Sequence, residues 1–87
     1  MKITILPRAE KELRKIPKFD QIAIAVKIRS LASPSLTGEE KLSGFFHVYR
    51  IRVGHYRVVY KKEGDEITVV LIRHRKDVYR MLATMLG

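Results

Sequence analysis

Residues 49–62, YRIRVGHYRVVYKK, combine two stretches of strand-forming residues with a turn between them, and this pattern sets the architecture of the chain. Gly54 and His55 suit a two-residue turn, because glycine is favoured at the first central position of a type II′ turn. The turn predicts an antiparallel hairpin with the cross-strand pairs Val53–Tyr56, Arg52–Arg57, Ile51–Val58, Arg50–Val59 and Tyr49–Tyr60.

Side chains alternate between the two faces of a strand, so this register sorts the hairpin residues into two sets. One face is apolar and aromatic and suits cover by helices: Tyr49, Ile51, Val53, Tyr56, Val58 and Tyr60. Arg50, Arg52 and Arg57 emerge together on the other face.

The pairing of Arg52 with Arg57 needs an explanation, because directly opposed like charges destabilise a strand pair by a few tenths to ~1 kcal/mol. It makes sense if an anion normally lies between them. The planar guanidinium fork binds phosphate bidentately, whereas solubility alone would be met by lysine opposite glutamate. We interpret this side of the hairpin as a phosphate-binding face. The alternative is a solvated face whose long side chains splay apart.

The segments before the hairpin predict a strand and two helices. Residues 2–6 alternate as a short strand, and Pro7 suits the first turn of a helix that runs to Pro17. A second helical segment reaches about Ala32, and its expected apolar face consists of Phe19, Ile22, Ala23 and Val26, with Ile28 and Leu31 as further candidates. SPSLTGEE, residues 33–40, is a loop by composition.

The segments from residue 45 onward predict three strands, FFHVYRIRV, YRVVYKK and EITVVLI, joined by short turns. The final KDVYRMLATMLG is compatible with a short C-terminal helix. The expected fold class is therefore α+β: a three- to four-stranded antiparallel sheet with an N-terminal helical hairpin packed on one face, in the order β-α-α-β-β-β.

Length and composition limit the function. At 87 residues the chain has room for a single domain, 1–87, with a small core and a site that lies open on a face. Its 18 Lys and Arg against 9 Asp and Glu give a net charge of +9, which attracts polyanions, although a merely soluble basic protein would look the same.

Several classes of site are not expected. The chain has no cysteine, and His47, His55 and His74 lack metal-ligand spacing, so we expect no disulfide, no metal and no cofactor. The first apolar run is too short for a signal peptide, and no run approaches the ~20 residues of a membrane span. We expect a cytoplasmic protein that does not associate with membranes.

Further cationic residues follow the last strand. Arg73, His74 and Arg75 should lie near the Gly54 turn if the strands are antiparallel. Strict alternation would put His74 on the arginine face and Arg73 on the core face, so an irregularity at the strand end must displace one of them. Tyr79 follows closely; its ring could stack on a base or form the edge of the core.

Three motifs carry a resemblance to a known family: LSG at 42–44, YRIRVGHYRVVY at 49–60 and HRKDVY at 74–79. Together they resemble the RelE/ParE toxin superfamily, and within it the RelE-like mRNA interferase branch. The resemblance covers the whole chain in element order and about residues 41–80 in sequence pattern.

This resemblance implies the toxin of a type II toxin–antitoxin pair, a ribosome-dependent endoribonuclease that cuts mRNA in the A site. The RNA's own 2′-hydroxyl would be the nucleophile, so no metal is needed. The resemblance implies that Arg57 and Arg73 act at the cleaved phosphate, that Tyr79 holds or stacks the substrate, and that Arg50 and Arg52 contact RNA or assist proton transfer. His74 is a further candidate catalytic residue, and Arg75 and Lys41 are further candidate RNA-binding residues.

The chemistry assigns these roles unevenly. Fixed guanidinium groups stabilise the charge that develops on the phosphate oxygens, with Arg57 the first choice and Arg73 the second. Better-known members have lysines where this chain has Arg50 and Arg52, and arginine is a poor general base. His74, with an ordinary pKa near 6.5, is the candidate general acid or base, although a structural or RNA-contacting role is equally open.

The resemblance also implies partners: a cognate acidic antitoxin of RelB type, the ribosome with mRNA, and operator DNA only through the antitoxin complex. Apolar residues of the C-terminal segment, Met81, Leu82, Met85 and Leu86, are candidates for an antitoxin groove or for packing on their own sheet. Two other functions stay open. A ParE-like inhibitor of DNA gyrase would not need Arg57 and Arg73 to converge, and a non-cleaving RNA-binding module would cut nothing.

Overall fold

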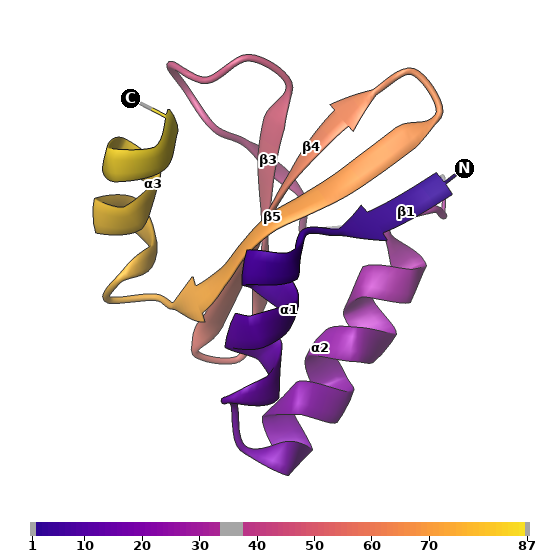
Figure 1. Cartoon of the computed structure of the whole chain (residues 1–87). Coiled ribbons are helices and arrows are strands. Elements are labelled where there is room, and N and C mark those ends of the chain that lie inside the picture. The colour runs from indigo at the N-terminus through magenta and orange to yellow at the C-terminus, as the bar shows by residue number, and fades with distance from the viewer. Residues whose placement is uncertain (1, 34–37, 87) are drawn as a thin grey trace.

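The computed structural model describes residues 2–33 and 38–86, with side chains as far as residue 84. The elements follow in the order β1 (Lys2–Ile5), α1 (Pro7–Arg14), α2 (Lys18–Ser30), β2 (Glu40–Lys41), β3 (Val48–Val53), β4 (Tyr56–Glu63), β5 (Glu66–His74) and α3 (Val78–Leu86). The predicted α+β class, with a helical hairpin ahead of the main strands and a short C-terminal helix, is confirmed (Figure 1). Of the predicted loop at 33–40, residues 34–37 lie outside the described residues.

The β3–β4 hairpin has the register that the sequence predicts, pair for pair from Val53–Tyr56 to Tyr49–Tyr60. Gly54 has a φ of +59°, and among the described non-glycine residues His47 alone has a positive φ. A positive φ at the first central position only is typical of a type II′ turn. The turn therefore fixes the face on which each arginine emerges.

The sheet differs from the prediction in two details. It has five strands in the order β1-β5-β4-β3-β2, because two-residue β2 pairs with Tyr49 and Arg50. β1 runs parallel to β5, so the sheet is mixed and not wholly antiparallel. An isolated N-terminal strand has no tight turn to set its partner or its direction, and for this reason the local pattern could not predict the pairing.

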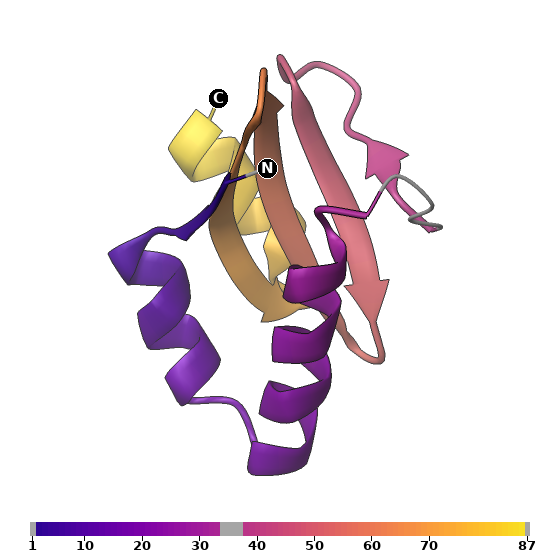
Figure 2. The same cartoon turned by 90° about the vertical axis from the view of Figure 1, so that its right-hand side faces the viewer.

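Helices cover both faces of this sheet, α1 and α2 on one face and α3 on the other (Figure 2). The larger cluster lies beneath α1 and α2 and consists of Ala9, Ile24, Ile28, Leu31, Ile51, Val58, Tyr60, Ile67, Val69 and Ile72. The smaller cluster lies beneath α3 and consists of Val48, Val59, Leu71, Val78 and Leu82. Leu82 and partly buried Met81 thus pack on their own sheet, while the side chains of Met85 and Leu86 lie outside the described residues.

A β-bulge in β5 changes the alternation that the sequence suggests. Val59 pairs with Leu71 and the next residue, Tyr60, pairs with Val69, so Val70 is an extra residue between them. An extra residue moves every later side chain to the opposite face. Arg73 therefore lies opposite Arg57, whereas His74 lies opposite Tyr56. An irregularity was predicted, but at the strand end, and that position was wrong because the bulge occurs in mid-strand.

The buried face of α2 also differs from the prediction. Ile24, Ile28 and Leu31, spaced four and three residues apart, pack on the sheet. Phe19 and Val26 are instead 84% and 57% exposed, and Ile22 is exposed as well. Apolar residues occupy almost every side of this helix, so periodicity alone did not identify the face that the sheet covers. Ile28 and Leu31 were predicted correctly.

One polar network anchors the chain just before β2. The buried hydroxyl of Tyr60 donates a hydrogen bond to Glu39 Oε1, and Lys62 Nζ lies 2.8 Å from the same oxygen. Burial raises the pKa of Tyr60, and the hydrogen bond to Glu39 raises it further. This network holds Glu39 on the sheet and so places β2 beside β3.

The burial pattern of α2 predicts unequal effects of two similar truncations. Ile24→Ala should lower the free energy of unfolding by ~2–5 kcal/mol, because it leaves a cavity in the core. Val26→Ala, on the same helix but exposed, should change it by no more than ~0.5 kcal/mol. Urea unfolding followed by circular dichroism measures both values, and equal losses would contradict the described face of α2.

The raised pKa of Tyr60 predicts a loss of stability at alkaline pH. Up to about pH 10 the hydroxyl is protonated in both states. Above that pH the unfolded chain releases the proton first, so the free energy of unfolding falls as pH rises. Unfolding measured between pH 8 and 11 should show a smaller fall in Tyr60→Phe than in the parent protein. A parent slope in Tyr60→Phe would refute the assignment.

Candidate functional site

Arg57 is the centre of the arginine face. It is only 8% exposed, and it is the one charged residue classed as buried in the described part of the chain. Its Nη1 donates hydrogen bonds to the backbone carbonyls of Gly54, at 3.2 Å, and Tyr56, at 3.1 Å. Within the described residues, Nε and Nη2 of Arg57 make no hydrogen bond. The turn therefore holds the guanidinium in place and leaves donors for an anion.

The charges around Arg57 are mostly positive. Burial is the largest of the effects that lower its pKa. Nearby cations lower this pKa further, in decreasing order Arg52, Arg50 and Arg75, while Glu40 acts in the opposite direction. Because an arginine keeps its charge at neutral pH, this end of the sheet concentrates four guanidinium groups that an anion would stabilise.

Arg50 connects three elements of the site. It forms an ion pair with Glu40 of β2, and its guanidinium carbon lies 5.5 Å from the centre of the Tyr79 ring of α3. A cation over an aromatic ring at this distance is attracted to it. Tyr79 is 50% exposed, so part of its side chain is accessible to a ligand. The structure thus brings Arg50, Arg57 and Tyr79 to one face.

Arg73 has a different environment, although its backbone lies opposite Arg57. Its Nε donates to Glu12 Oε2 of α1, and Glu12 Oε1 accepts a hydrogen bond of 3.2 Å from the backbone N–H of Ile72. β1 pairs with β5 only as far as Val69, so Glu12 satisfies the free edge of β5 beyond β1. The side chain of Arg73 is thereby held at that edge.

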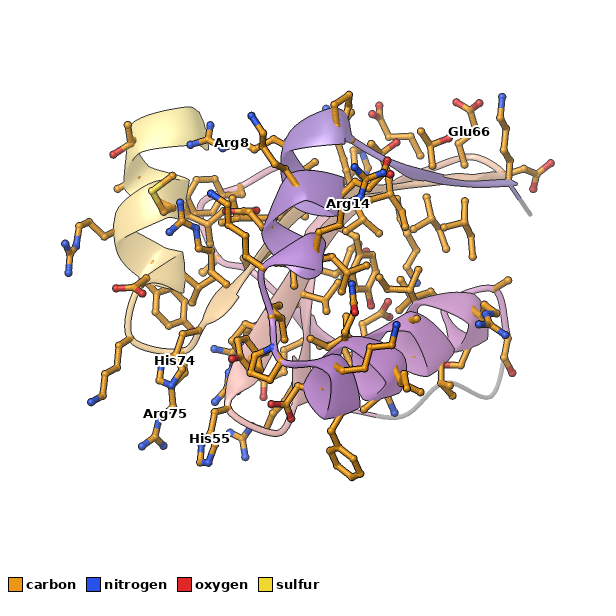
Figure 3. All side chains as sticks on the ribbon, turned by 60° about the horizontal axis from the view of Figure 1, so that its bottom comes forward. Arg8, Arg14, His55, Glu66, His74 and Arg75 are labelled. Carbon is orange, nitrogen blue, oxygen red and sulfur yellow. The ribbon has the colours of Figure 1, made fainter. Side chains whose placement is uncertain are left out.

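His74 and Arg75 lie beside the hairpin turn, as the sequence predicts (Figure 3). The backbone N–H of Arg75 donates to the carbonyl of His55 at 2.8 Å. The His74 ring stacks on that of His55, with centroids 6.1 Å apart, and meets the edge of Tyr56 at 5.8 Å. Its Nδ1 accepts a hydrogen bond from the N–H of Lys76, so Nε2 carries the proton of the neutral ring.

Lys41, the last predicted site residue, lies at the opposite end of β3 from the turn. It pairs with Tyr49 across β2 and β3 and lines a groove of about 480 Å³ together with residues 42–46.

Sequence reasoning missed the two glutamates that hold site arginines. Glu40 is 10 residues from Arg50, and Glu12 is 61 residues from Arg73. Glu40 is the cross-strand partner of Arg50, but β2 is only two residues long and has no alternating pattern that would have predicted this pair. The separation of Glu12 and Arg73 belongs to no helix turn or hairpin, so no local pattern could have indicated that pair.

No helix in the described part of the chain is long and apolar enough to cross a membrane. The chain is 29% identical over 84 residues to the toxin RelE3 of Methanocaldococcus jannaschii. The alignment covers 91% of this chain and 96% of RelE3.

Two solved structures are similar over most of the chain. The toxin in the RelB–RelE antitoxin–toxin complex from Methanococcus jannaschii superposes with a TM-score of 0.76 at 27% identity, over 90% of this chain and 96% of that one. The isolated Escherichia coli RelE toxin gives a TM-score of 0.70 at 26% identity, over 95% of both chains.

The profile of the family described as "ParE toxin of type II toxin-antitoxin system, parDE" matches residues 3–79. This match begins at the second residue of β1 and ends at the second residue of α3, so it includes α1, α2 and the strands β2 to β5. The chain therefore belongs to the ParE toxin family of type II toxin–antitoxin systems, within the RelE/ParE superfamily.

Proposed function

We propose that this toxin is a metal-independent endoribonuclease of the RelE type, which cuts mRNA in the ribosomal A site and so inhibits translation. The observation that supports this activity best is Arg57, a guanidinium buried at the hairpin turn with donors left for an anion. A fixed cation of this kind needs no reorganisation when charge develops on a phosphate. The similarity to RelE toxins favours the same activity.

The proposed reaction is an in-line transfer within the RNA. The 2′-oxygen attacks the adjacent phosphorus as its proton leaves, and the bond from phosphorus to the 5′-oxygen breaks as that oxygen gains a proton. The products are a 2′,3′-cyclic phosphate and a 5′-hydroxyl. Negative charge builds up on the two non-bridging oxygens, and Arg57 is proposed to contact them. Arg50 and Arg52 hold the flanking backbone, and Tyr79 stacks on the substrate.

Arg75 is proposed as the second phosphate-binding arginine, with Arg73 in a supporting position. The charge of Arg75 acts on Arg57, whereas Arg73 is engaged by Glu12 at the edge of the sheet. Arg75 is exposed and has no carboxylate partner among the described residues, so a phosphate can bind it without displacing an ion pair.

His74 is proposed to exchange the proton. In this structure Nδ1 accepts from the N–H of Lys76 and Nε2 carries the proton of the neutral ring. Nε2 could donate that proton to the leaving oxygen once Nδ1 has gained a proton, which would release the N–H of Lys76. Its backbone position is one residue before Arg75, although it lies on the face of the sheet opposite Arg57. To reach the leaving oxygen, His74 would have to move around the end of the strand on the ribosome, because here it lies on the other face of the sheet.

The proposed partners are an acidic antitoxin of RelB type, the ribosome and mRNA, with operator DNA bound only through the antitoxin complex. The relative from Methanococcus jannaschii was crystallised with RelB. A net charge of +9 favours both an acidic partner and RNA. Ribosomes as the target imply action in the cytoplasm.

A second candidate is a ParE-like inhibitor of DNA gyrase. It is favoured by the matching family, described as the ParE toxin, and by the engagement of Arg73 with Glu12, because such a protein binder needs no convergence of Arg57 and Arg73.

The first test uses purified ribosomes programmed with a defined message, beside the same message free in solution. The parent protein should create new RNA ends only in the A-site codon, mapped by primer extension. Arg57→Ala should slow cutting by about 10²–10³-fold without unfolding the domain, as checked by circular dichroism. An uncut message with folded parent protein, together with inhibition of gyrase supercoiling, would establish the second candidate instead.

The two arginines at the end of β5 should behave differently in the same assay. Arg75→Ala should slow cutting at least tenfold and leave the free energy of unfolding within ~0.5 kcal/mol of the parent, since the side chain is exposed. Arg73→Ala should lower the free energy of unfolding by ~1–3 kcal/mol, because it leaves Glu12 without its charged partner. If Arg73→Ala slowed cutting more than Arg75→Ala and left the free energy of unfolding unchanged, Arg73 and not Arg75 would be the second phosphate-binding arginine.

A further inference from the structure

Phe46 is an exposed aromatic residue that the proposed reaction does not use. It lies in the segment 42–47 between β2 and β3, and it is 81% exposed. The segment is closed at its ends by a hydrogen bond from the N–H of Leu42 to the carbonyl of Val48, at 2.9 Å. Leu42 and Phe45 pack against the smaller core cluster, so Phe46 is the large apolar residue that this turn presents to solvent.

The ring of Phe46 is held from one side. The His47 ring meets it edge to face, with centroids 4.5 Å apart and an angle of 83° between the planes. His47 has a φ of +58°, a backbone conformation that few non-glycine residues adopt. A strained residue directly after an exposed aromatic ring motivates the hypothesis that this turn has a function.

Phe46 stands between two hollows, each with a lysine in its lining. The hollow of about 480 Å³ is lined by Lys41 and residues 42–46. The second, of about 210 Å³, is lined by residues 44–46 with Val48, Lys61 and Val70. Flat apolar surface with cations beside it is the combination that binds single-stranded nucleic acid, because bases stack on the ring while the backbone follows the charges.

This surface lies on the same face of the sheet as the arginines, although Val48 itself is buried beneath α3. Val48 alternates in phase with Arg50 and Arg52 along β3, so all three emerge on the same side of the sheet. From Arg52 to Val48 the strand spans ~13 Å, at ~3.3 Å per residue. An RNA strand whose phosphate is bound near Arg52 would therefore reach Phe46 within a few nucleotides.

We propose that Phe46 and the two hollows beside it form a base-stacking subsite for single-stranded RNA, with Lys41 and Lys61 contacting the RNA backbone. The inference rests on the proposed function, whose substrate it extends by a contact away from the cleaved bond. Phe19 is a natural control, because it is equally exposed but lies on α2, across the sheet from the arginines.

The first test uses the absence of tryptophan from the chain, which makes Phe46→Trp a single fluorescent reporter. The probe is a non-cleavable 2′-O-methyl RNA, as a dinucleotide and as a hexanucleotide. The hexanucleotide should quench Phe46→Trp but not Phe19→Trp, and the quenching should weaken as salt is raised. Equal quenching of both reporters would overturn the subsite. The subsite would also be overturned if neither reporter were quenched while fluorescence anisotropy of a labelled hexanucleotide showed binding.

The second test measures affinity. Phe46→Ala should bind the hexanucleotide about 5- to 150-fold more weakly, the loss of one stacked base, and should bind the dinucleotide as the parent does. Phe46→Tyr should restore binding and Phe46→Leu should not, because only a ring stacks. Full binding by Phe46→Leu would show apolar contact without stacking and would refute the proposal. The proposal would also be refuted if the fluorescence of Phe46→Trp responded to the antitoxin of the same operon and not to RNA.

The ribosome assay separates this inference from the function on which it rests. Phe46→Ala should raise the message concentration needed for half-maximal cutting and leave the maximal rate unchanged, because stacking far from the reacting bond binds ground and transition states equally. Unaltered cutting at every concentration would overturn the subsite and leave the nuclease intact. If the message stayed uncut while RNA quenched the Phe46→Trp reporter, the proposed nuclease activity would be refuted and the proposed RNA-binding subsite would stand.

Discussion

The two-residue turn at Gly54 is the constraint on which the site depends. Its positive φ sets the hairpin register, and the register sends every second residue of β3 and β4 to the arginine face. A slip by one residue would turn the arginines into the core and the core residues out to solvent. The same turn supplies the carbonyls that hold Arg57. Fold and site are therefore fixed by one local feature.

What surrounds the turn decides which cations are available to a ligand. α3 covers only part of the second face and places Tyr79 beside Arg50. The bulge at Val70 places Arg73 directly opposite Arg57 across β4 and β5. The hydrogen bond to Glu12 then holds the side chain of Arg73 at the edge of the sheet. Because Arg75 comes after the end of β5 and bonds to the turn through its backbone, its side chain stays free to act on Arg57.

Sequence reasoning succeeded where the determining interactions are local. The Gly54 turn, the hairpin register and the clustering of Arg50, Arg52 and Arg57 all depend on residues within one hairpin, and all were predicted. It failed where contacts are distant in sequence. The parallel pairing of β1, the bulge at Val70 and the Glu12–Arg73 pair depend on segments that meet only in the folded sheet. The face of α2 failed for another reason, because a helix apolar on nearly every side gives no periodic signal.

The distribution of carboxylates indicates where an anion would bind. Arg50 is paired with Glu40, and Arg73 is paired with Glu12. Among the described residues no carboxylate pairs with Arg52 or Arg57, although these two lie directly opposite each other. Their repulsion persists because the turn and the packed face behind it hold the register. A phosphate between Arg52 and Arg57 would remove that repulsion without breaking an existing ion pair, whereas binding at Arg50 or Arg73 must first displace a glutamate. The unpaired arginines are thus the place where binding of a phosphate gains the most.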